Sequence, residues 1–210
     1  MKLYHSTASP NSRRVRMFMA EKGISIPLQP VNLGEKEQFS DGFKAINPRQ
    51  QVPVLVLDDG TTIAEVPAIW RFLEETQPER PLLGSDATGK ALVTMWERRA
   101  ELDGFAPTME GVRNSVPGLK GRALSGPHDY EQIPGLVERS KRRVANFYAD
   151  FDARLTDVPF VAGADFSAAD ITAVVTVDFA TAALKMPIPE GCRAMHRWYE
   201  TIAARPSVRA

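Results

Sequence analysis

The side chains best suited to chemistry near the start of the chain are those of the segment Ser9-Pro10-Asn11-Ser12. Pro10 favours the first position of a helix, because the amide hydrogen that proline lacks would have no intrahelical acceptor there. Ser9 is therefore predicted to be the N-cap residue, with its hydroxyl beside free backbone N–H groups and the positive end of the helix dipole. Such a place stabilises an anion, and a thiolate bound there would be more populated and ready to attack an electrophile. A serine that only caps the helix is the alternative interpretation of the same residues.

The elements that position this segment alternate between strand and helix in the first half of the chain. Apolar residues with a period of two predict strands, and those with a period near 3.6 predict helices. The predicted order is a strand at 2–5, a helix at 10–22, a strand at 26–31, a weak helix or ordered loop at 34–45, strands at 51–57 and 61–63 joined by a turn at Asp59-Gly60, and a helix at 68–76. The first half is therefore predicted to be an α/β domain.

The second half has helical periodicity and no convincing strand pattern. Ser167 and Asp170 form the sequence pattern of a capping box, which we interpret as structural, and a continuous apolar segment behind them predicts a buried central helix. The predicted helices begin near residue 91, cover about 136–155 and 171–184, and end with one near 195–202. Pro and Gly predict a linker at 77–89 and a long loop at 104–134. This half is predicted to be all-helical.

Composition excludes several classes of function. Lys+Arg and Asp+Glu both number 26, so the formal net charge is zero and no nucleic-acid partner is indicated. The basic clusters at 13–16 and 141–143 are interpreted as solvated helix faces. A single cysteine, Cys192, rules out an internal disulfide framework, and three widely spaced histidines give no zinc signature, so no metal is predicted. With no segment typical of a secretory signal or membrane span, we expect no membrane partner and a cytoplasmic location.

Four ordered motifs together resemble the cytosolic glutathione S-transferase family, in the bacterial type with a Ser-Pro motif at the first helix. The resemblance covers essentially the whole chain. The motifs are Ser9-Pro10 with Arg14-Val15-Arg16 and Glu21-Lys22-Gly23, then Asn47-Pro48-Arg49-Gln50-Gln51-Val52-Pro53-Val54-Leu55, then Ile63-Ala64-Glu65-Val66-Pro67-Ala68-Ile69, and finally Phe166-Ser167-Ala168-Ala169-Asp170. The resemblance implies a thioredoxin-like glutathione-binding domain at 1–80, an all-helical bundle with the electrophile site at 88–210, and a homodimer.

The resemblance also implies roles for individual residues. Ser9 would hydrogen-bond the glutathione thiolate, with Asn11 and Ser12 as alternatives. Pro53 would follow a cis bond, which also explains a proline inside a strand pattern, and the Val52 backbone would pair with the cysteinyl backbone of glutathione. Glutathione contacts are therefore implied for Gln38, Gln51, Val52, Pro53, Glu65 and Val66. Among these, Gln51 and Gln38 are candidates for the glycine carboxylate, although a polar glutamine on a surface loop is ordinary.

Val66 is where the sequence departs from the family pattern. The usual pair is an acid followed by Ser or Thr, whose hydroxyl and N–H bind the γ-glutamyl carboxylate. Here Glu65 remains as the partner of the glutathione ammonium, but Val66 offers only its backbone N–H and the helix dipole. One lost charge-assisted hydrogen bond is worth about 1.5–3 kcal/mol, or roughly ten- to a hundredfold in affinity. We therefore expect weakened glutathione binding.

The predicted function is conjugation or reduction of a hydrophobic electrophile by the glutathione thiolate, as in detoxification, with glutathione as cosubstrate. Two alternatives remain open: a non-catalytic binding module, which Val66 favours, and a glutathione-dependent disulfide reductase, which needs no protein cysteine. The candidates for the electrophile pocket are Trp96, Arg99, Phe105, Met109 and Arg113. An aromatic residue or methionine at helical spacing is also typical of a helical core.

Overall fold

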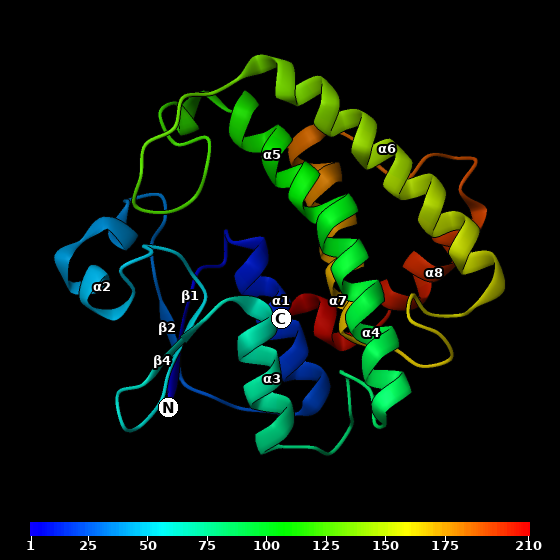
Figure 1. Cartoon of the computed structure of the whole chain (residues 1–210), viewed down its shortest axis with the longest axis horizontal. Helices are drawn as coiled ribbons and strands as arrows, with labels where there is room; N and C mark the ends of the chain where they lie inside the picture. The colour runs from blue at the N-terminus through cyan, green and yellow to red at the C-terminus, as the bar shows by residue number, and fades with distance from the viewer. The chain divides into compact units, whose positions relative to one another are not determined.

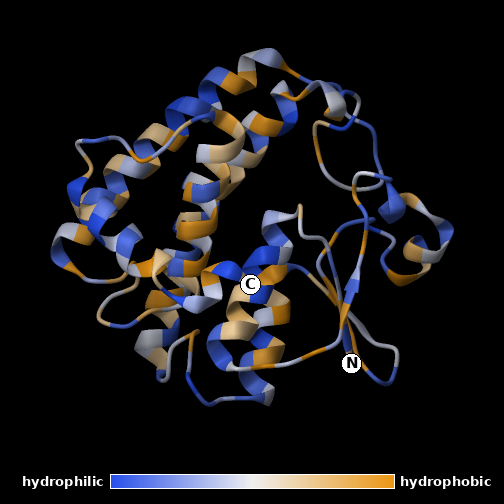
Figure 2. Cartoon of the chain, turned by 180° about the vertical axis from the view of Figure 1, so that it is seen from behind, coloured by the Kyte–Doolittle hydropathy of each residue, from blue (hydrophilic) through white to orange (hydrophobic).

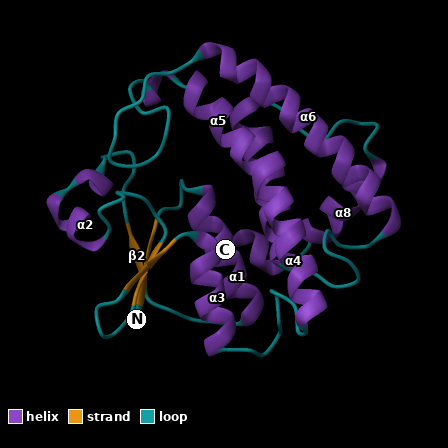
Figure 3. Ribbon diagram, in the orientation of Figure 1, coloured by secondary structure: helices purple, strands orange, loops and turns teal.

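A computed structural model describes all residues, 1–210, and divides the chain into two compact units. The first unit contains Met1–Arg80, Ser125–His128 and Arg209–Ala210, and the second contains Pro81–Leu124 and Asp129–Val208. Every strand of the sheet belongs to the first unit, whereas the second is built from helices (Figure 3). The predicted combination of a thioredoxin-like domain and an all-helical domain is confirmed. No helix is long and apolar enough to span a bilayer.

The first unit is a four-stranded mixed sheet with three α-helices (Figure 1). Its elements are β1 (Lys2–His5), α1 (Pro10–Lys22), β2 (Leu28–Pro30), a 3₁₀ turn (Glu37–Phe39), α2 (Asp41–Ile46), β3 (Val54–Val56), β4 (Thr62–Ala64) and α3 (Val66–Thr76). The strand order is β2-β1-β3-β4, with β1 parallel to β2 and antiparallel to β3, and β3 antiparallel to β4. The predicted hairpin between β3 and β4 is confirmed, with Gly60 at a φ of 87° in its turn.

Alternation along the strands gives the sheet two buried faces. Leu3 of β1 and Leu55 of β3 are at most 1% exposed and are paired in register. Their neighbours Tyr4 and Val54 also pair, and they belong to the opposite face because successive side chains of a strand alternate. Phe43 of α2 packs edge-on against Tyr4 and joins Val54 in one apolar cluster. Burial on both faces therefore fixes the register of β1 against β3.

Two predictions for the first unit change in detail. The second strand is limited to Leu28–Pro30, because Pro27 precedes it and Pro30 is its last residue, and neither proline can donate a ladder hydrogen bond. The segment predicted as a weak helix or loop contains α2, because the Ser40 hydroxyl caps it by accepting from the Phe43 amide at 3.2 Å.

The second unit is a bundle arranged around a buried central helix. Its elements are α4 (Ala87–Arg99), a π-helical segment (Ala100–Phe105), α5 (Ala106–Ser115), a 3₁₀ turn (Pro117–Leu119), α6 (Pro134–Asp157), α7 (Ala168–Phe179), a second π-helical segment (Ala180–Leu184), α8 (Arg193–Ala203) and a final 3₁₀ turn (Pro206–Arg209). Hydrophobic and hydrophilic residues alternate along many of the helices (Figure 2). Every residue of α7 from Ala168 to Val177 is buried. The predicted buried central helix is therefore confirmed.

The predicted long loop at 104–134 is wrong in its first part, where α5 runs to Ser115. Two of the glycines among the Gly and Pro residues that suggested a loop instead permit close packing between helices. A Cβ on Gly104 would lie 2.8 Å from the Phe147 ring, and one on Gly111 would lie 3.2 Å from Ser140 and Leu184. Pro107 is tolerated because it follows the π-helical segment at the beginning of α5.

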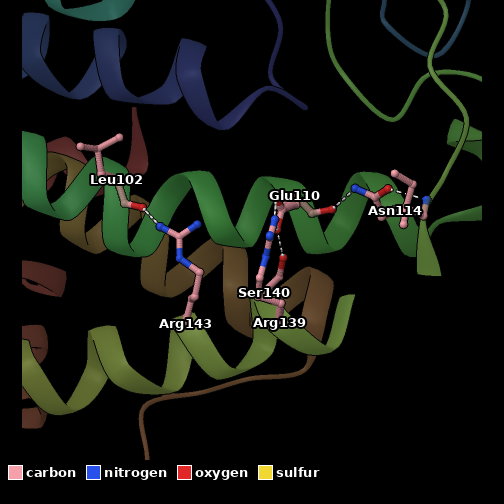
Figure 4. Close-up of polar contacts among 7 residues, drawn as sticks. Leu102, Glu110, Asn114, Arg139, Ser140 and Arg143 are labelled. Atoms are coloured by element: carbon pink, nitrogen blue, oxygen red, sulfur yellow. Dashed lines mark hydrogen bonds and ion pairs between the residues drawn. The ribbon is translucent and has the colours of Figure 1, made fainter. Parts of the chain in front are cut away.

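A row of polar contacts fastens α5 to α6 (Figure 4). The Glu110 carboxylate accepts from Arg139 at 2.9 Å and from the buried Ser140 hydroxyl at 2.8 Å. One end of the row is Arg143, which donates to the Leu102 carbonyl at 2.6 Å. At the other end the Asn114 side chain accepts from the Ile133 amide, just before α6 begins. These bonds follow the contact of α6 with α5 and the π-helical segment before it, and the bond to Ile133 lies where the loop between the helices returns.

The start of α7 confirms the predicted capping box. The Ser167 hydroxyl accepts from the Ala169 amide at 3.3 Å, and the Asp170 carboxylate accepts from the Ser167 amide at 2.9 Å. Asp170 also accepts from the Val161 amide at 2.9 Å and from the Trp198 indole at 2.8 Å. Burial raises the pKa of this carboxyl to about 6, against the opposing effect of its hydrogen bonds. Side chains of the second unit itself therefore satisfy the hydrogen-bond donors at this helix start.

Candidate functional site

Ser9 occupies the N-cap of α1, as predicted. Its backbone is extended, and its Oγ accepts from the Ser12 amide at 3.2 Å, which leaves the hydroxyl proton free to donate. Pro10 begins the helix, and no acidic residue lies in the first turn. The positive end of the helix dipole is therefore not neutralised locally, and the Ser9 hydroxyl can donate to an anion placed there.

Ser12 faces inward from the first turn of α1. It is fully buried, and its Oγ accepts from the Ser6 amide at 3.2 Å. This bond ties the chain between β1 and α1 to the helix. The geometry gives Ser12 a structural bond and favours Ser9 and Asn11 as the residues that face a ligand.

Asn11 is half-buried, and its Oδ1 accepts from Arg14 Nη1 at 3.1 Å. The prediction that the basic cluster at 13–16 is a solvated face is wrong for Arg14, which is 1% exposed with its guanidinium 5.1 Å from the centroid of the Trp70 ring. Sequence reasoning missed this residue. The signal was available, because the spacing of Arg14 and Phe18 places both on one side of the helix, and Phe18 is fully buried.

The bond between Val52 and Pro53 is cis, as predicted, and it directly precedes β3. Both residues are buried. The Asn47 side chain fixes the approach to this bond, since its amide donates to the Gln51 carbonyl at 2.9 Å and its oxygen accepts from the Arg49 amide at 3.0 Å. Gln51 is half-buried beside the cis bond. An ordered stretch of backbone therefore leads to the predicted pairing position at Val52.

The start of α3 has no side-chain cap. Glu65 precedes the helix with a φ of 72° and a ψ of 128°, is exposed, and makes no side-chain capping bond. That conformation is costly for a residue other than glycine, and such strain is concentrated at binding and catalytic sites. Val66, the first helical residue, is 3% exposed, and its amide has no intrahelical acceptor. Pro67 has no amide hydrogen to contribute.

Gln38 lies in the 3₁₀ turn before α2 and is 7% exposed. Its Oε1 is buried without a hydrogen-bond partner. A carboxylate would need the Nε2 donor of this side chain, whereas the buried Oε1 can only accept. The structure therefore gives Gln38 an unused acceptor, and both Gln38 and Gln51 stay candidates for a carboxylate.

The five candidates for the electrophile pocket all belong to the helical unit. Trp96 packs edge-on against Phe151, with the guanidinium carbons of Arg99 and Arg154 at 4.7 and 4.5 Å from its ring centroid. Phe105 is 5% exposed and contacts Phe179, in the packing of the helices. Phe105 therefore has the contacts of a core residue, whereas Trp96 is only partly buried.

Met109 and Arg113 follow Phe105 at intervals of four residues on one side of α5. Met109 is half-buried. The Arg113 guanidinium donates to the Arg122 carbonyl at 2.5 Å and to the Leu124 carbonyl at 2.9 Å, and burial followed by the charge of Arg122 lowers its pKa. Arg113 therefore holds the loop after α5.

Other titratable groups do not form a second reactive centre. His5 contacts Arg16 at 3.2 Å, and burial together with that cation lowers its pKa. Burial and the nearby Asp152 raise the pKa of Cys192, which disfavours its thiolate. No three His, Cys, Asp or Glu side chains come together as a group that could hold a metal ion.

Comparisons with known proteins match both units of the chain. Residues 8–76 match the model of the glutathione S-transferase N-terminal domain, and residues 134–201 match that of the C-terminal domain. Glutathione S-transferase 2 of Saccharomyces cerevisiae is 36% identical over 211 residues, covering 100% of this chain and 88% of the relative. Maleylacetoacetate isomerase of Rattus norvegicus is 36% identical over 140 residues, covering 62% of this chain and 64% of the relative.

Solved structures show the same likeness. The crystal structure of Gtt2 from Saccharomyces cerevisiae has a TM-score of 0.90 at 34% identity, covering 100% of this chain and 99% of the other. A class Gtt2 glutathione S-transferase of Vibrio parahaemolyticus has a TM-score of 0.85 at 31% identity, covering 100% and 96%. Both likenesses extend over the two units of this chain.

Proposed function

Because the chain belongs to the glutathione S-transferase family, we propose that it is an enzyme that binds glutathione and uses its thiolate to conjugate or reduce a hydrophobic electrophile. The observation that carries the proposal is the start of α1, where the N-cap Ser9 keeps a free hydroxyl proton at the positive end of the helix. The nucleophile is the sulfur of the cosubstrate, so no protein thiol is required.

Ser9 stabilises the thiolate in this scheme by donating its hydroxyl proton as a hydrogen bond. The bond from the Ser12 amide holds the Ser9 oxygen in place, and the helix dipole adds a favourable potential for the negative sulfur. Both effects lower the pKa of the glutathione thiol and raise the thiolate fraction at neutral pH. The thiolate then attacks the electrophilic carbon, forming the carbon–sulfur bond as a halide leaves or an epoxide C–O bond opens. With a peroxide, the sulfur breaks the O–O bond and becomes a sulfenic acid as the alcohol leaves, and a second glutathione converts the sulfenic acid to glutathione disulfide and water.

The γ-glutamyl end of glutathione binds at the start of α3. The Val66 amide and the helix dipole receive the carboxylate, and the exposed Glu65 carboxylate pairs with the ammonium group. The strained backbone of Glu65, with its positive φ, leads directly into the uncapped helix. Such strain is concentrated at binding sites, and it therefore supports this assignment. The cysteinyl backbone pairs with Val52 beside the cis bond, and Gln51 receives the glycine carboxylate.

The missing hydroxyl at Val66 is the observation that favours a second candidate, a binding module without catalysis. The buried isopropyl group cannot donate, so the carboxylate meets backbone donors alone. The free hydroxyl proton of Ser9 favours the enzyme, whereas the uncapped start of α3 is compatible with both candidates. A disulfide reductase that works through glutathione shares this binding site and differs in its substrate.

The proposal extends to assembly, location and substrate. We propose a homodimer and a cytoplasmic role in detoxification, as the family resemblance implies. Leu92, Met95 and Leu102 are large apolar side chains of α4 and the π-helical segment that remain about two-fifths exposed, and they support the dimer. Light scattering at micromolar protein concentration tests it, and the mass of a monomer would contradict it.

Calorimetric titration with reduced glutathione separates the enzyme from the binding module when it is combined with turnover assays. We expect the protein to bind glutathione and to turn over at least one substrate of a panel that contains aryl halides, epoxides, peroxides and maleylacetoacetate. We also expect Ser9→Ala to lose that turnover. Ser40→Ala is the matched control, because Ser40 caps α2 with a bond of the same length. Binding without turnover of any panel member or of a glutathione-mixed disulfide supports the module. Turnover of the disulfide alone supports the reductase.

A further inference from the structure

Arg14 is a buried cation in the second turn of α1 that the proposed catalytic scheme does not use. Its guanidinium lies over the Trp70 ring at 5.1 Å, and Trp70 in turn stacks on Phe18 with the ring centroids 5.4 Å apart. All three side chains are at most 1% exposed. A planar guanidinium enclosed in this way and held against an aromatic ring has little freedom to turn, so Arg14 is a rigid donor.

The bond from Arg14 to Asn11 determines which way the Asn11 carboxamide faces. Arg14 Nη1 lies 3.1 Å from the Asn11 side chain. A carboxamide has an acceptor oxygen and a donor nitrogen on opposite sides of Cγ, whereas a guanidinium has donors only. The oxygen must therefore face Arg14, and the Nδ2 amino group must face away from it, on a side chain that is half-exposed.

Building on the function proposed above, we propose that Arg14 is a positioning residue that fixes the Asn11 carboxamide as a second hydrogen-bond donor to the glutathione thiolate, beside the Ser9 hydroxyl. Ser9 is the N-cap and Asn11 is the second residue of α1, so both side chains leave the first turn of one helix. Ser12, the third polar residue of that turn, is committed inward to the Ser6 amide. Without Arg14 the amide could turn its oxygen lone pairs toward the sulfur, where they would repel the thiolate.

Two substitutions of Asn11 test the direction of its donor. Asn11→Ala removes the donor, so the pKa of the bound glutathione thiol should rise by about one unit. Asn11→Asp keeps an acceptor for Arg14 but replaces the Nδ2 donor with a charged oxygen, so the rise should be larger. The thiol pKa is measured from the ultraviolet absorbance of the thiolate in glutathione-saturated protein, and the pH profile of kcat/KM should move with it.

Arg14→Lys, made both in the wild-type protein and in Asn11→Ala, tests the route through Asn11. Lysine keeps the charge but loses the planar fork that holds the amide. If Arg14 acts through Asn11, the substitution raises the thiol pKa in the wild-type background and changes it no further in the Asn11→Ala background. Arg16→Lys is the control, since Arg16 contacts His5, the Ser6 carbonyl and Ala210 and makes no bond to Asn11.

The outcomes separate this inference from the proposed function. If Ser9→Ala raises the thiol pKa while both Asn11 variants keep the wild-type value, the inference fails and the proposed function stands. If glutathione does not bind the wild-type protein, the proposed function fails first. Equal shifts for Arg14→Lys in the two backgrounds would overturn the positioning role. If thermal melts show that Arg14→Lys does not fold, the two Asn11 variants decide. The proposal is supported if Asn11→Asp raises the thiol pKa more than Asn11→Ala does and is also the more stable variant. Any other order overturns it.

Discussion

The helices α3 and α7, of 11 and 12 residues, begin in opposite ways. The start of α7 is buried, and Ser167 and Asp170 satisfy its donors through a capping box. The start of α3 has no side-chain cap, and the residue before it is strained and exposed. The α1 start lies between these extremes, because Ser9 caps one amide and keeps its own proton free. A helix start that the protein saturates is structural, and one left open can receive a ligand.

The largest effect that this comparison predicts is the loss of stability when the Asp170 carboxylate is removed. Asp170→Ala leaves the Val161 and Ser167 amides and the Trp198 indole buried without an acceptor. We expect the free energy of unfolding to fall by about 3–5 kcal/mol, as measured by urea denaturation. Asp86→Ala is the matched control, because Asp86 caps α4 on the surface through one bond to Gly89 and its loss should cost about 1 kcal/mol. Equal losses in the two variants would contradict the structural role of the α7 start.

The removal of the Ser9 hydroxyl should instead affect chemistry more than stability. Ser9→Ala loses a hydrogen bond to a charged sulfur, so kcat/KM should fall roughly ten- to a hundredfold, while unfolding should cost about 1 kcal/mol. Ser40→Ala should cost a similar amount of stability with unchanged kcat/KM. A loss of kcat/KM that is no greater in Ser9→Ala than in Ser40→Ala would remove Ser9 from the mechanism and promote Asn11.

Adding a donor at the open start of α3 should strengthen binding. Val66→Ser restores a hydroxyl beside the backbone amide, and glutathione affinity should rise roughly tenfold, below the hundredfold limit because the new hydroxyl must also be desolvated. Val66→Ala separates this effect from the loss of buried volume, since Val66 is 3% exposed. Calorimetry on all three proteins measures the difference. An affinity for Val66→Ser no greater than that for Val66→Ala would mean that the carboxylate binds elsewhere.

The smallest expected effect is a pH dependence at the saturated helix start. The pKa of Asp170 is about 6 in the folded protein against an ordinary value of 3.8, so between these values the folded state binds more protons than the unfolded state. The contribution of this group to stability is therefore present at low pH and is lost as the pH rises through 6. The destabilisation caused by Asp170→Ala should be about 1 kcal/mol larger at pH 5 than at pH 7. The reverse order in urea titrations at the two pH values would contradict this pKa.

The sequence predicted those features that depend on neighbouring residues. The N-cap at Ser9, the turn at Gly60 and the capping box at Ser167 each follow from local backbone chemistry, and all three are present. The cis bond before Pro53 needed the family resemblance in addition, because a proline in a strand pattern also fits an edge strand.

What the sequence could not predict depends on contacts between distant elements. Gly104 suggested a loop, but its role is to let Phe147 and Thr176 approach the helix. Arg14 suggested a solvated face, but Trp70 from α3 covers it. The electrophile candidates were chosen by residue type alone, and the structure shows contacts that the sequence did not predict, with Trp96 packed against Phe151 and beside Arg99 and Arg154. The sequence shows which side chains are apolar, but it does not show which helix or strand each of them packs against.

A crystal structure of the protein soaked with reduced glutathione tests the central claim most directly. The open helix starts predict density with the γ-glutamyl carboxylate at the Val66 amide, the ammonium group beside Glu65, and the sulfur within hydrogen-bond distance of the Ser9 hydroxyl and of Asn11 Nδ2. Glutathione bound with its sulfur away from the start of α1, or no density at the start of α3 under conditions in which calorimetry shows saturation, would contradict the account.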